Sequence, residues 1–144
     1  MNNYFRFGIF GINEMLDKFA TVFESIPKDP HKTMSNSQFK KQYTKTFIVG
    51  GFPVKVKMWS LRYQLFYTKG ITCVGCGISG SYFALERFRD GCENKGHFNL
   101  YSLTNGYEIL MTKDHIIPKA KRGKDHISNF QVMCTTCNLL KGRK

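Results

Sequence analysis

The stretch CTTC at residues 134–137 repeats a spacing that occurs earlier as CVGC at residues 73–76. In each stretch two cysteines are separated by two residues, so both thiolates can leave one turn and take two corners of a tetrahedron. Because four thiolates leave no open coordination position, a zinc ion bound there would be structural, and it would contribute roughly 10 kcal/mol or more to folding. The predicted zinc ligands are Cys73, Cys76, Cys134 and Cys137.

Residues inside and beside the two pairs favour turns. Gly75 and Gly77 suit a tight turn at the first pair, and Thr135 and Thr136 are residue types that often cap the start of a helix. Scattered core cysteines or a redox pair are the alternative interpretations, which two matched pairs in one small domain disfavour. The sequence therefore predicts a C-terminal half that is stapled by a metal ion.

A second informative stretch, TKDHIIPKAK at residues 112–121, lies between the two pairs. It ends the second of two apolar runs joined by Asn105-Gly106, a dipeptide typical of a tight hairpin. Adjacent side chains of a regular strand point to opposite faces, so Asp114 and His115 can share a site only if the strand loses its regularity there. Because Pro118 cannot donate to a ladder and restricts the residue before it, strand pairing is predicted to end just past His115.

The rest of the chain predicts an α+β fold with a mixed helix and hairpin N-terminal region. Apolar residues three and four apart predict an amphipathic helix over 12–26, and the polar stretch 27–42 is expected to be a loop or linker. Alternating residues in 45–59 predict a hairpin around Gly50-Gly51. The stretch 58–70 is expected to contain a short helix that ends at its last residue, a glycine, with a strand as the alternative.

The charge of the chain is strongly positive in both halves. The 144 residues carry 22 basic and 10 acidic side chains, which gives a formal net charge of +12. This length predicts one domain, or a small domain with an arm. There are 11 basic and 4 acidic residues before Gly70, and 11 and 6 from Gly70 onward. Such a field attracts polyanions, of which nucleic acid is the commonest, while a surface tuned for solubility or for anionic lipid is the alternative.

The sequence contains no apolar stretch near the roughly 18 to 20 residues that a membrane span needs. The first 16 residues, with Arg6 as their single basic residue, make a poor signal peptide, so the cysteines are expected in a reducing compartment, the cytoplasm. Cys92, the fifth cysteine, is expected to be a free thiol. His97 is expected to be a surface residue, although a role as a substitute metal ligand stays open.

Taken together, CVGC, DHIIP and NFQVMCTTCNLLKG resemble the HNH endonuclease family, whose ββα-metal (His-Me finger) fold often carries a four-cysteine zinc site. The resemblance covers roughly residues 61–144 and predicts an HNH domain there. Residues 1–60 carry no part of this resemblance and form a basic region that is expected to contact DNA or to bind a partner. The pieces that carry the resemblance are Cys73, Cys76, Asp114, His115, Pro118, Asn129, Cys134, Cys137, Asn138 and Lys141.

The resemblance implies a role for each residue of the expected catalytic site. His115 is similar to the general base of the family, and Asn129 to the residue that holds the loop and the histidine in register. Asn138 stands where the family usually has a histidine, as in the H-N-N variant of phage and intron-encoded members. Asp114 and Asn138 would then bind the catalytic metal ion through oxygen.

The chemistry of these residue types agrees with those roles. Hydrolysis of a phosphodiester needs a deprotonated water, and histidine, with an ordinary pKa of about 6.5, suits a general base at cellular pH. A carboxylate and an amide carbonyl are hard ligands, which favours Mg²⁺ or Mn²⁺ over zinc at this second metal site. The family implies products with a 5′-phosphate and a 3′-hydroxyl.

Two basic clusters accompany these residues. One cluster follows Pro118, and the other ends the chain. Beside the expected site they suit phosphate contacts, although a solvated charge run is the alternative. His31 and His126 are expected to be solvated. The predicted nucleic-acid contacts are Lys119, Lys121, Arg122, Lys124, Lys141 and Arg143.

Three functions stay open from the sequence. The leading hypothesis is a metal-dependent endonuclease that cuts double-stranded DNA, in the host-cell cytoplasm if the chain is phage-encoded. The second is a non-catalytic DNA-binding protein stapled by zinc, and the third is a regulatory zinc protein that binds other proteins. A second copy of the chain and a phage or host protein are the further partners considered, and RNA stays open as a substrate.

Overall fold

A computed structural model describes residues 3–142 and has the mixed α+β architecture that the sequence predicts. Strands form one connected sheet system, and the helices pack around it. The elements are β1 (Tyr4–Phe10), α1 (Ile12–Ser25), η1 (Pro30–Lys32), α2 (Asn36–Tyr43), β2 (Thr44–Val49), β3 (Phe52–Lys57), α3 (Leu61–Lys69), β4 (Tyr82–Phe88), β5 (Lys95–Thr104), β6 (Tyr107–His115), η2 (Lys119–Lys121), η3 (Ile127–Asn129), β7 (Phe130–Cys134) and α4 (Thr135–Lys141).

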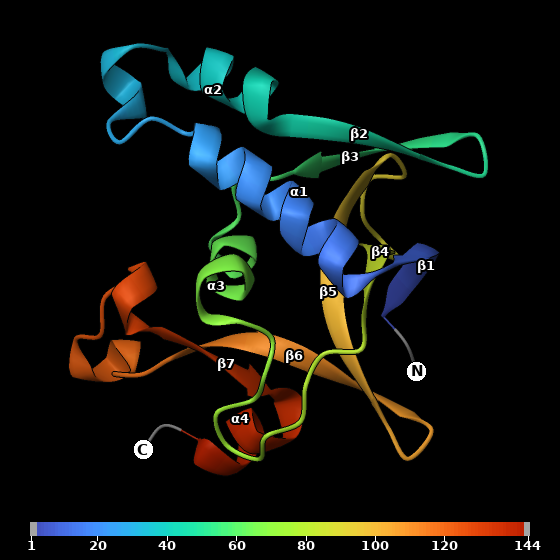
Figure 1. The fold of residues 1–144 in the computed structure, drawn as a ribbon, viewed down its shortest axis with the longest axis vertical. Coiled ribbons are helices and arrows are strands. Elements are labelled where there is room, and N and C mark those ends of the chain that lie inside the picture. Colours follow the sequence, from blue (N-terminus) through green and yellow to red (C-terminus); the bar gives the residue numbers. More distant parts are fainter. Residues whose placement is uncertain (1–2, 143–144) are drawn as a thin grey trace.

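The long strand β5 connects the two halves of the seven-stranded sheet. It pairs with β4 along Glu86↔His97 to Tyr82↔Tyr101, and its last residues pair with β6, which in turn pairs with β7. Its first two residues pair with β3 in parallel, and β3 pairs with β2 in a hairpin. Figure 1 shows β5 running between α1 with the β2–β3 hairpin above and β6, β7 and α4 below.

A single hydrophobic cluster contains residues from both sides of position 60. The ring of Phe19 from α1 stacks on Tyr63 from α3, with centroids 4.6 Å apart, and both pack against Phe98 of β5. The same cluster continues to Val132 and Cys134 of β7. The N-terminal region therefore shares its core with the C-terminal elements that carry the predicted site. None of the helices within residues 3–142 has the length and apolarity of a membrane span.

Most of the predicted local elements are confirmed. Helix α1 fits the periodicity of residues 12–26, and α3 ends at Gly70. Both predicted hairpins form, because their turn residues adopt positive φ angles, 57° and 81° at Gly50 and Gly51 and 52° and 79° at Asn105 and Gly106. Strand pairing ends as predicted, with His115↔Phe130 as the last pair of β6 and β7.

The prediction that residues 27–42 form a loop is wrong, because they contain η1 and most of α2. Helix α2 begins with a capping box in which Gln38 N donates to Ser35 Oγ at 3.1 Å and Ser35 N donates to Gln38 Oε1 at 2.8 Å. Phe39 and Tyr43, one turn apart, pack against each other with ring centroids 4.8 Å apart. The polar composition of the stretch conceals this helix, since only two large apolar residues anchor it.

Candidate functional site

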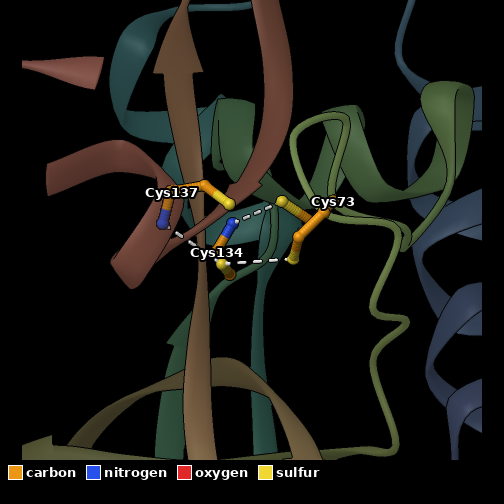
Figure 2. A group of neighbouring side chains, drawn as sticks. Cys73, Cys134 and Cys137 are labelled. Carbon is orange, nitrogen blue, oxygen red and sulfur yellow. Dashed lines mark hydrogen bonds between the residues drawn. The ribbon is translucent and has the colours of Figure 1, made fainter. Parts of the chain in front are cut away.

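The four cysteines of the two pairs converge on one point between the loop after α3 and the start of α4. Their Sγ atoms all lie within 4.8 Å of one another, and those of Cys76 and Cys134 are 3.8 Å apart. Thiolates at the corners of a zinc tetrahedron, with Zn–S bonds of about 2.3 Å, would be about 3.8 Å apart. Figure 2 shows the side chains of Cys73, Cys134 and Cys137 turned toward one another. The predicted four-cysteine cluster is confirmed as a site that could hold a metal ion.

Backbone N–H groups surround the sulfur atoms. Cys73 Sγ accepts from Gly75 N and from Cys134 N, both at 3.3 Å, and Cys134 Sγ accepts from Cys137 N at 3.4 Å. Burial opposes ionisation of the Cys73 thiol, but the backbone donors outweigh it and lower its pKa to about 6. The arrangement thus stabilises the thiolate, which is the form that binds metal.

Gly75 is required by packing rather than by its backbone angles. A Cβ at this position would lie 2.9 Å from Cys137 Sγ, which is too close for a real side chain.

The start of α4 differs from expectation, because its cap is Cys134 and not Thr135 or Thr136. Cys134 is the extended residue that ends β7, and its own sulfur takes the acceptor role of a capping oxygen.

A second site lies where β6 ends. An open cavity of about 450 Å³ separates the end of this strand from η2 and α4. It brings together three of the predicted catalytic residues, Asp114, His115 and Asn138, whereas Asn129 does not line it. The lining residues are Lys113, Asp114, His115, Pro118, Lys119, Ala120, Asn138, Lys141 and Gly142.

Asp114 reaches the cavity from the face of β6 that packs on α4. The residue is only 8% exposed, and its Oδ2 accepts from Gln131 Nε2 at 2.9 Å and from Lys141 Nζ at 2.6 Å. Lys141 Nζ also donates to the backbone carbonyl of His115 at 2.7 Å. Lys141 therefore lies inside the cavity as the counterion of Asp114, and not only among the solvent-facing basic residues.

His115 reaches the same cavity from the opposite face of β6. Its ring packs edge-on against Phe130, with centroids 4.9 Å apart, and its Nε2 lies 2.6 Å from Asp125 Oδ1. Asp125 Oδ2 in turn lies 3.0 Å from Lys119 Nζ. The hydrogen bond with His115 and the contact with Lys119 lower the pKa of the Asp125 carboxyl.

The expectation that Asp114 and His115 can meet only at an irregular strand is therefore wrong. Both residues keep regular pairing, with Asp114 opposite Gln131 and His115 opposite Phe130, and their side chains leave opposite faces of the strand. Both nevertheless line the cavity at the end of the strand.

The two predicted asparagines make different contacts. Asn129 is buried and binds the loop between β6 and β7, since its Nδ2 donates to the carbonyls of Ile117 and Lys124 at 3.0 and 2.9 Å and its Oδ1 accepts from Ile117 N at 2.9 Å. Asn138 Nδ2 donates to Thr112 Oγ1 at 3.1 Å. Among the described residues, the Oδ1 atom of Asn138 has no hydrogen-bond donor and is left as the available ligand atom of this amide.

The other predicted residues are placed as follows. Lys119, Lys121, Arg122 and Lys124 are exposed, whereas Arg143 lies outside the described residues. His31 and His126 are exposed as expected, and Cys92 is an exposed free thiol.

The expectation that His97 is a surface residue is wrong. Its ring is half-buried between Tyr4 and Phe88, with centroids 5.4 and 5.2 Å away, because β1 and β4 bring two aromatic side chains over it. Burial, followed by the charge of Arg62, lowers its pKa to about 4. His97 is absent from the metal-binding group found among the described residues.

Residues 90–144 match the HNH endonuclease family. The resemblance seen in the sequence is thus confirmed over the segment that contains the cavity residues and the second cysteine pair, and it indicates a nuclease. The first pair lies outside the match, and the fold brings it to the second. No curated protein and no solved structure matches the chain.

Sequence reasoning missed Asp125, which contacts the predicted general base. One signal was available, because Asp125 is the single acidic residue in the basic stretch 116–128. The spacing gave no further hint, since Asp125 lies ten positions after His115, beyond η2.

Proposed function

We propose that the protein is a metal-dependent endonuclease that hydrolyses DNA phosphodiester bonds and leaves 5′-phosphate and 3′-hydroxyl ends. The observation that carries the proposal is the meeting of Asp114, His115 and Asn138 on one open cavity within the segment that matches the HNH family. The four-cysteine group would hold structural zinc at a separate position, where all four corners are taken by sulfur.

Asp114 and Asn138 are the residues that would hold Mg²⁺ or Mn²⁺. Their fit rests on the donor set. The Asp114 carboxylate already binds the ammonium group of Lys141, the Asn138 amide oxygen accepts from no donor within residues 3–142, and both residues line the same cavity. A divalent ion bound there would stabilise the charge that develops at phosphorus. Lys141 would then release Asp114 and turn to a phosphate, so that its positive charge stays near the cavity.

His115 is the residue that would take a proton from the attacking water. Its Nε2 is engaged by the Asp125 carboxylate, which can only accept a hydrogen bond, so Nε2 carries the proton and Nδ1 is left as the basic atom. Asp125 would act as a positioning residue, because it holds the ring and its tautomer without touching the substrate. Asn129 would hold the loop in the position that brings Asp125 to His115, because its side chain donates to the carbonyls of Ile117 and Lys124 in that loop.

The exposed basic residues of the loop after β6 would contact the phosphates on both sides of the cut. Lys119 lines the cavity itself, and Lys121, Arg122 and Lys124 extend the positive surface away from it. Such contacts make binding fall steeply as the salt concentration rises.

The direct test compares nicking of a supercoiled plasmid by the wild type, His115→Ala and His126→Ala with Mg²⁺ present. His126→Ala is a matched control, because His126 is an exposed histidine of the same loop that does not line the cavity. We expect the wild type and His126→Ala to nick equally and His115→Ala to lose nicking, with zinc content unchanged in all three. Equal nicking by His115→Ala and the wild type would refute the proposal.

A non-catalytic DNA-binding protein is the second candidate function. The ion pair between Lys141 and Asp114 favours it, since this contact satisfies the carboxylate without a second metal ion. This candidate predicts DNA binding that needs no divalent ion and no strand cutting with Mg²⁺ or Mn²⁺.

A further inference from the structure

Three phenylalanines surround a groove that is distant from the proposed catalytic cavity. Phe5, Phe7 and Phe52 line an open groove of about 420 Å³ between β1 and the tip of the β2–β3 hairpin, together with Val49, Arg87 and Glu93. In Figure 1, β1 and this hairpin tip lie on the right, whereas the orange segment that follows β6 lies on the left. Most of the lining therefore comes from the N-terminal region, and the groove lies on a different side of the molecule from the segment that follows β6.

Two of the aromatic side chains that line this groove are partly exposed to solvent. Phe7 and Phe52 stack with centroids 5.8 Å apart and planes 13° apart, and Phe5 meets Phe7 edge-on at 5.1 Å. Phe5 and Phe52 remain 42% and 41% exposed. Because water-exposed aromatic clusters of this kind are unfavourable in a protein that binds nothing there, they mark interaction surfaces.

A fixed positive charge accompanies the rings. The guanidinium of Arg87 lies 5.1 Å from the centre of the Phe5 ring, and its Nη1 donates to the carbonyls of Phe88 and Arg89 at 3.1 and 3.2 Å. These contacts hold the group at the rim, where it can meet an anion and also stack with a planar ligand.

Two further lysines lie near Glu93, but they point to the opposite face of the sheet from Phe52. Lys55 and Lys95 are paired across β3 and β5, both are exposed, and Lys55 N donates to the carbonyl of Asn94 at 2.7 Å. The carboxylate of Glu93 repels a phosphate but can accept a hydrogen bond from the amino group of a base. The groove therefore suits a nucleotide whose base lies between the rings and whose phosphate lies beside Arg87.

The charge of the whole chain decides between the possible occupants. Two copies of a chain with a net charge of +12 repel each other, whereas a polyanion is attracted. We propose that the groove binds an unpaired base of a single DNA strand, which stacks on Phe5 and Phe52 while a neighbouring phosphate contacts Arg87. This site goes beyond the proposed cutting activity and gives the N-terminal region a preference for DNA with a single-stranded segment.

The test measures binding of a fluorescent oligo(dC) by anisotropy without added Mg²⁺, with an oligonucleotide of about ten nucleotides. We expect Phe5→Ala and Phe52→Ala each to weaken binding by about tenfold, because stacking on an aromatic ring carries much of the affinity for single strands. Phe5→Trp, which keeps a flat face, should bind like the wild type.

Ile48→Ala is the matched control for Phe52→Ala. Ile48 is 72% exposed on the same hairpin, but it pairs with Pro53 and points to the opposite face from Val49 and Phe52. Wild-type affinity in Phe5→Ala and Phe52→Ala, or an equal loss in Ile48→Ala, would overturn the proposal. His115→Ala should keep full affinity for oligo(dC), so a failure of the proposed nuclease activity is distinguishable from a failure of this site.

Sedimentation velocity tests the competing occupant, a second copy of the chain. We expect the wild type and Phe52→Ala both to sediment as monomers over the concentrations used for binding. A dimer that Phe52→Ala abolishes while oligo(dC) binding is unchanged would overturn the proposal in favour of self-association.

Discussion

The ring of His115 is held by contacts on two of its edges. Phe130 packs against the ring, and the Asp125 carboxylate engages Nε2 at 2.6 Å. A carboxylate that accepts the Nε2 proton favours the tautomer in which Nδ1 is free, and it also limits rotation of the ring. If His115 is the general base, both effects keep its basic nitrogen aimed at one place in the cavity.

Replacing Asp125 with Asn should therefore slow DNA cutting without weakening DNA binding. The amide can donate to Nε2 as well as accept from it, so the protonated nitrogen is no longer fixed, and we expect kcat for plasmid nicking to fall roughly tenfold or more. The nitrogen chemical shifts of His115 in an NMR spectrum should show the change of tautomer directly. Asp90→Asn, an exposed acid that does not line the cavity, makes the same change in net charge and serves as the control. Unchanged kcat and unchanged shifts in Asp125→Asn would contradict this role.

The loop between β6 and β7 places Asp125 beside His115, and close contacts within the loop restrict its backbone. Arg122 adopts a left-handed φ of 66°, and the N–H groups of Lys121 and Gly123 both donate to the carbonyl of Pro118 at 2.9 Å. A Cβ on Gly123 would lie 1.7 Å from the carbonyl oxygen of Ile117. The loop therefore cannot keep this path with any other residue at position 123.

Gly123→Ala should displace the loop and impair the site. We expect overpacking to cost about 1 to 3 kcal/mol of stability and nicking to fall because Asp125 and Lys119 move away from His115. Gly11→Ala is the matched control, since a Cβ there meets no atom within 4 Å and the backbone angles are ordinary. Thermal denaturation and plasmid nicking measure the two effects. A Gly123→Ala variant with the stability and activity of the wild type would show that the loop is free to adjust.

At the scale of helices, strands and turns, the sequence predicts those features that a few adjacent residues encode. The Asn105-Gly106 turn, the two cysteine pairs and the end of β6 before Pro118 each depend on a few adjacent residues, and all form as expected. The pairing of Asp125 with His115 could not be predicted in this way, because it depends on the backbone path through Arg122 and Gly123. His97 was misplaced for a related reason, since its burial comes from strands that are distant in the sequence.

Across the whole molecule, the cysteine group connects the segment after α3 to the elements that carry the cavity. Val74 N donates to the carbonyl of Val132 at 3.0 Å beside the sulfur atoms, and Cys73 and Cys134 belong to the hydrophobic core. Helix α4 starts at the cysteine group and bears Asn138 and Lys141 on the side that meets Asp114. A metal ion bound by the four sulfurs would thus fix the distance between α4 and β6, and with it the shape of the cavity.

Removing that ion should abolish cutting even when Mg²⁺ is supplied. Treatment with a chelator followed by Mg²⁺ alone should leave the protein inactive, whereas zinc and Mg²⁺ together should restore nicking, because α4 is held only when the four thiolates share an ion. Cys76→Ser removes one ligand and should lower the Tm by more than roughly 10 °C, since metal binding contributes several kcal/mol to folding. Cys92→Ser is the control, because Cys92 is a cysteine outside the cluster. Full recovery of nicking with Mg²⁺ alone, together with an unchanged Tm in Cys76→Ser, would mean that the cavity keeps its shape without the metal.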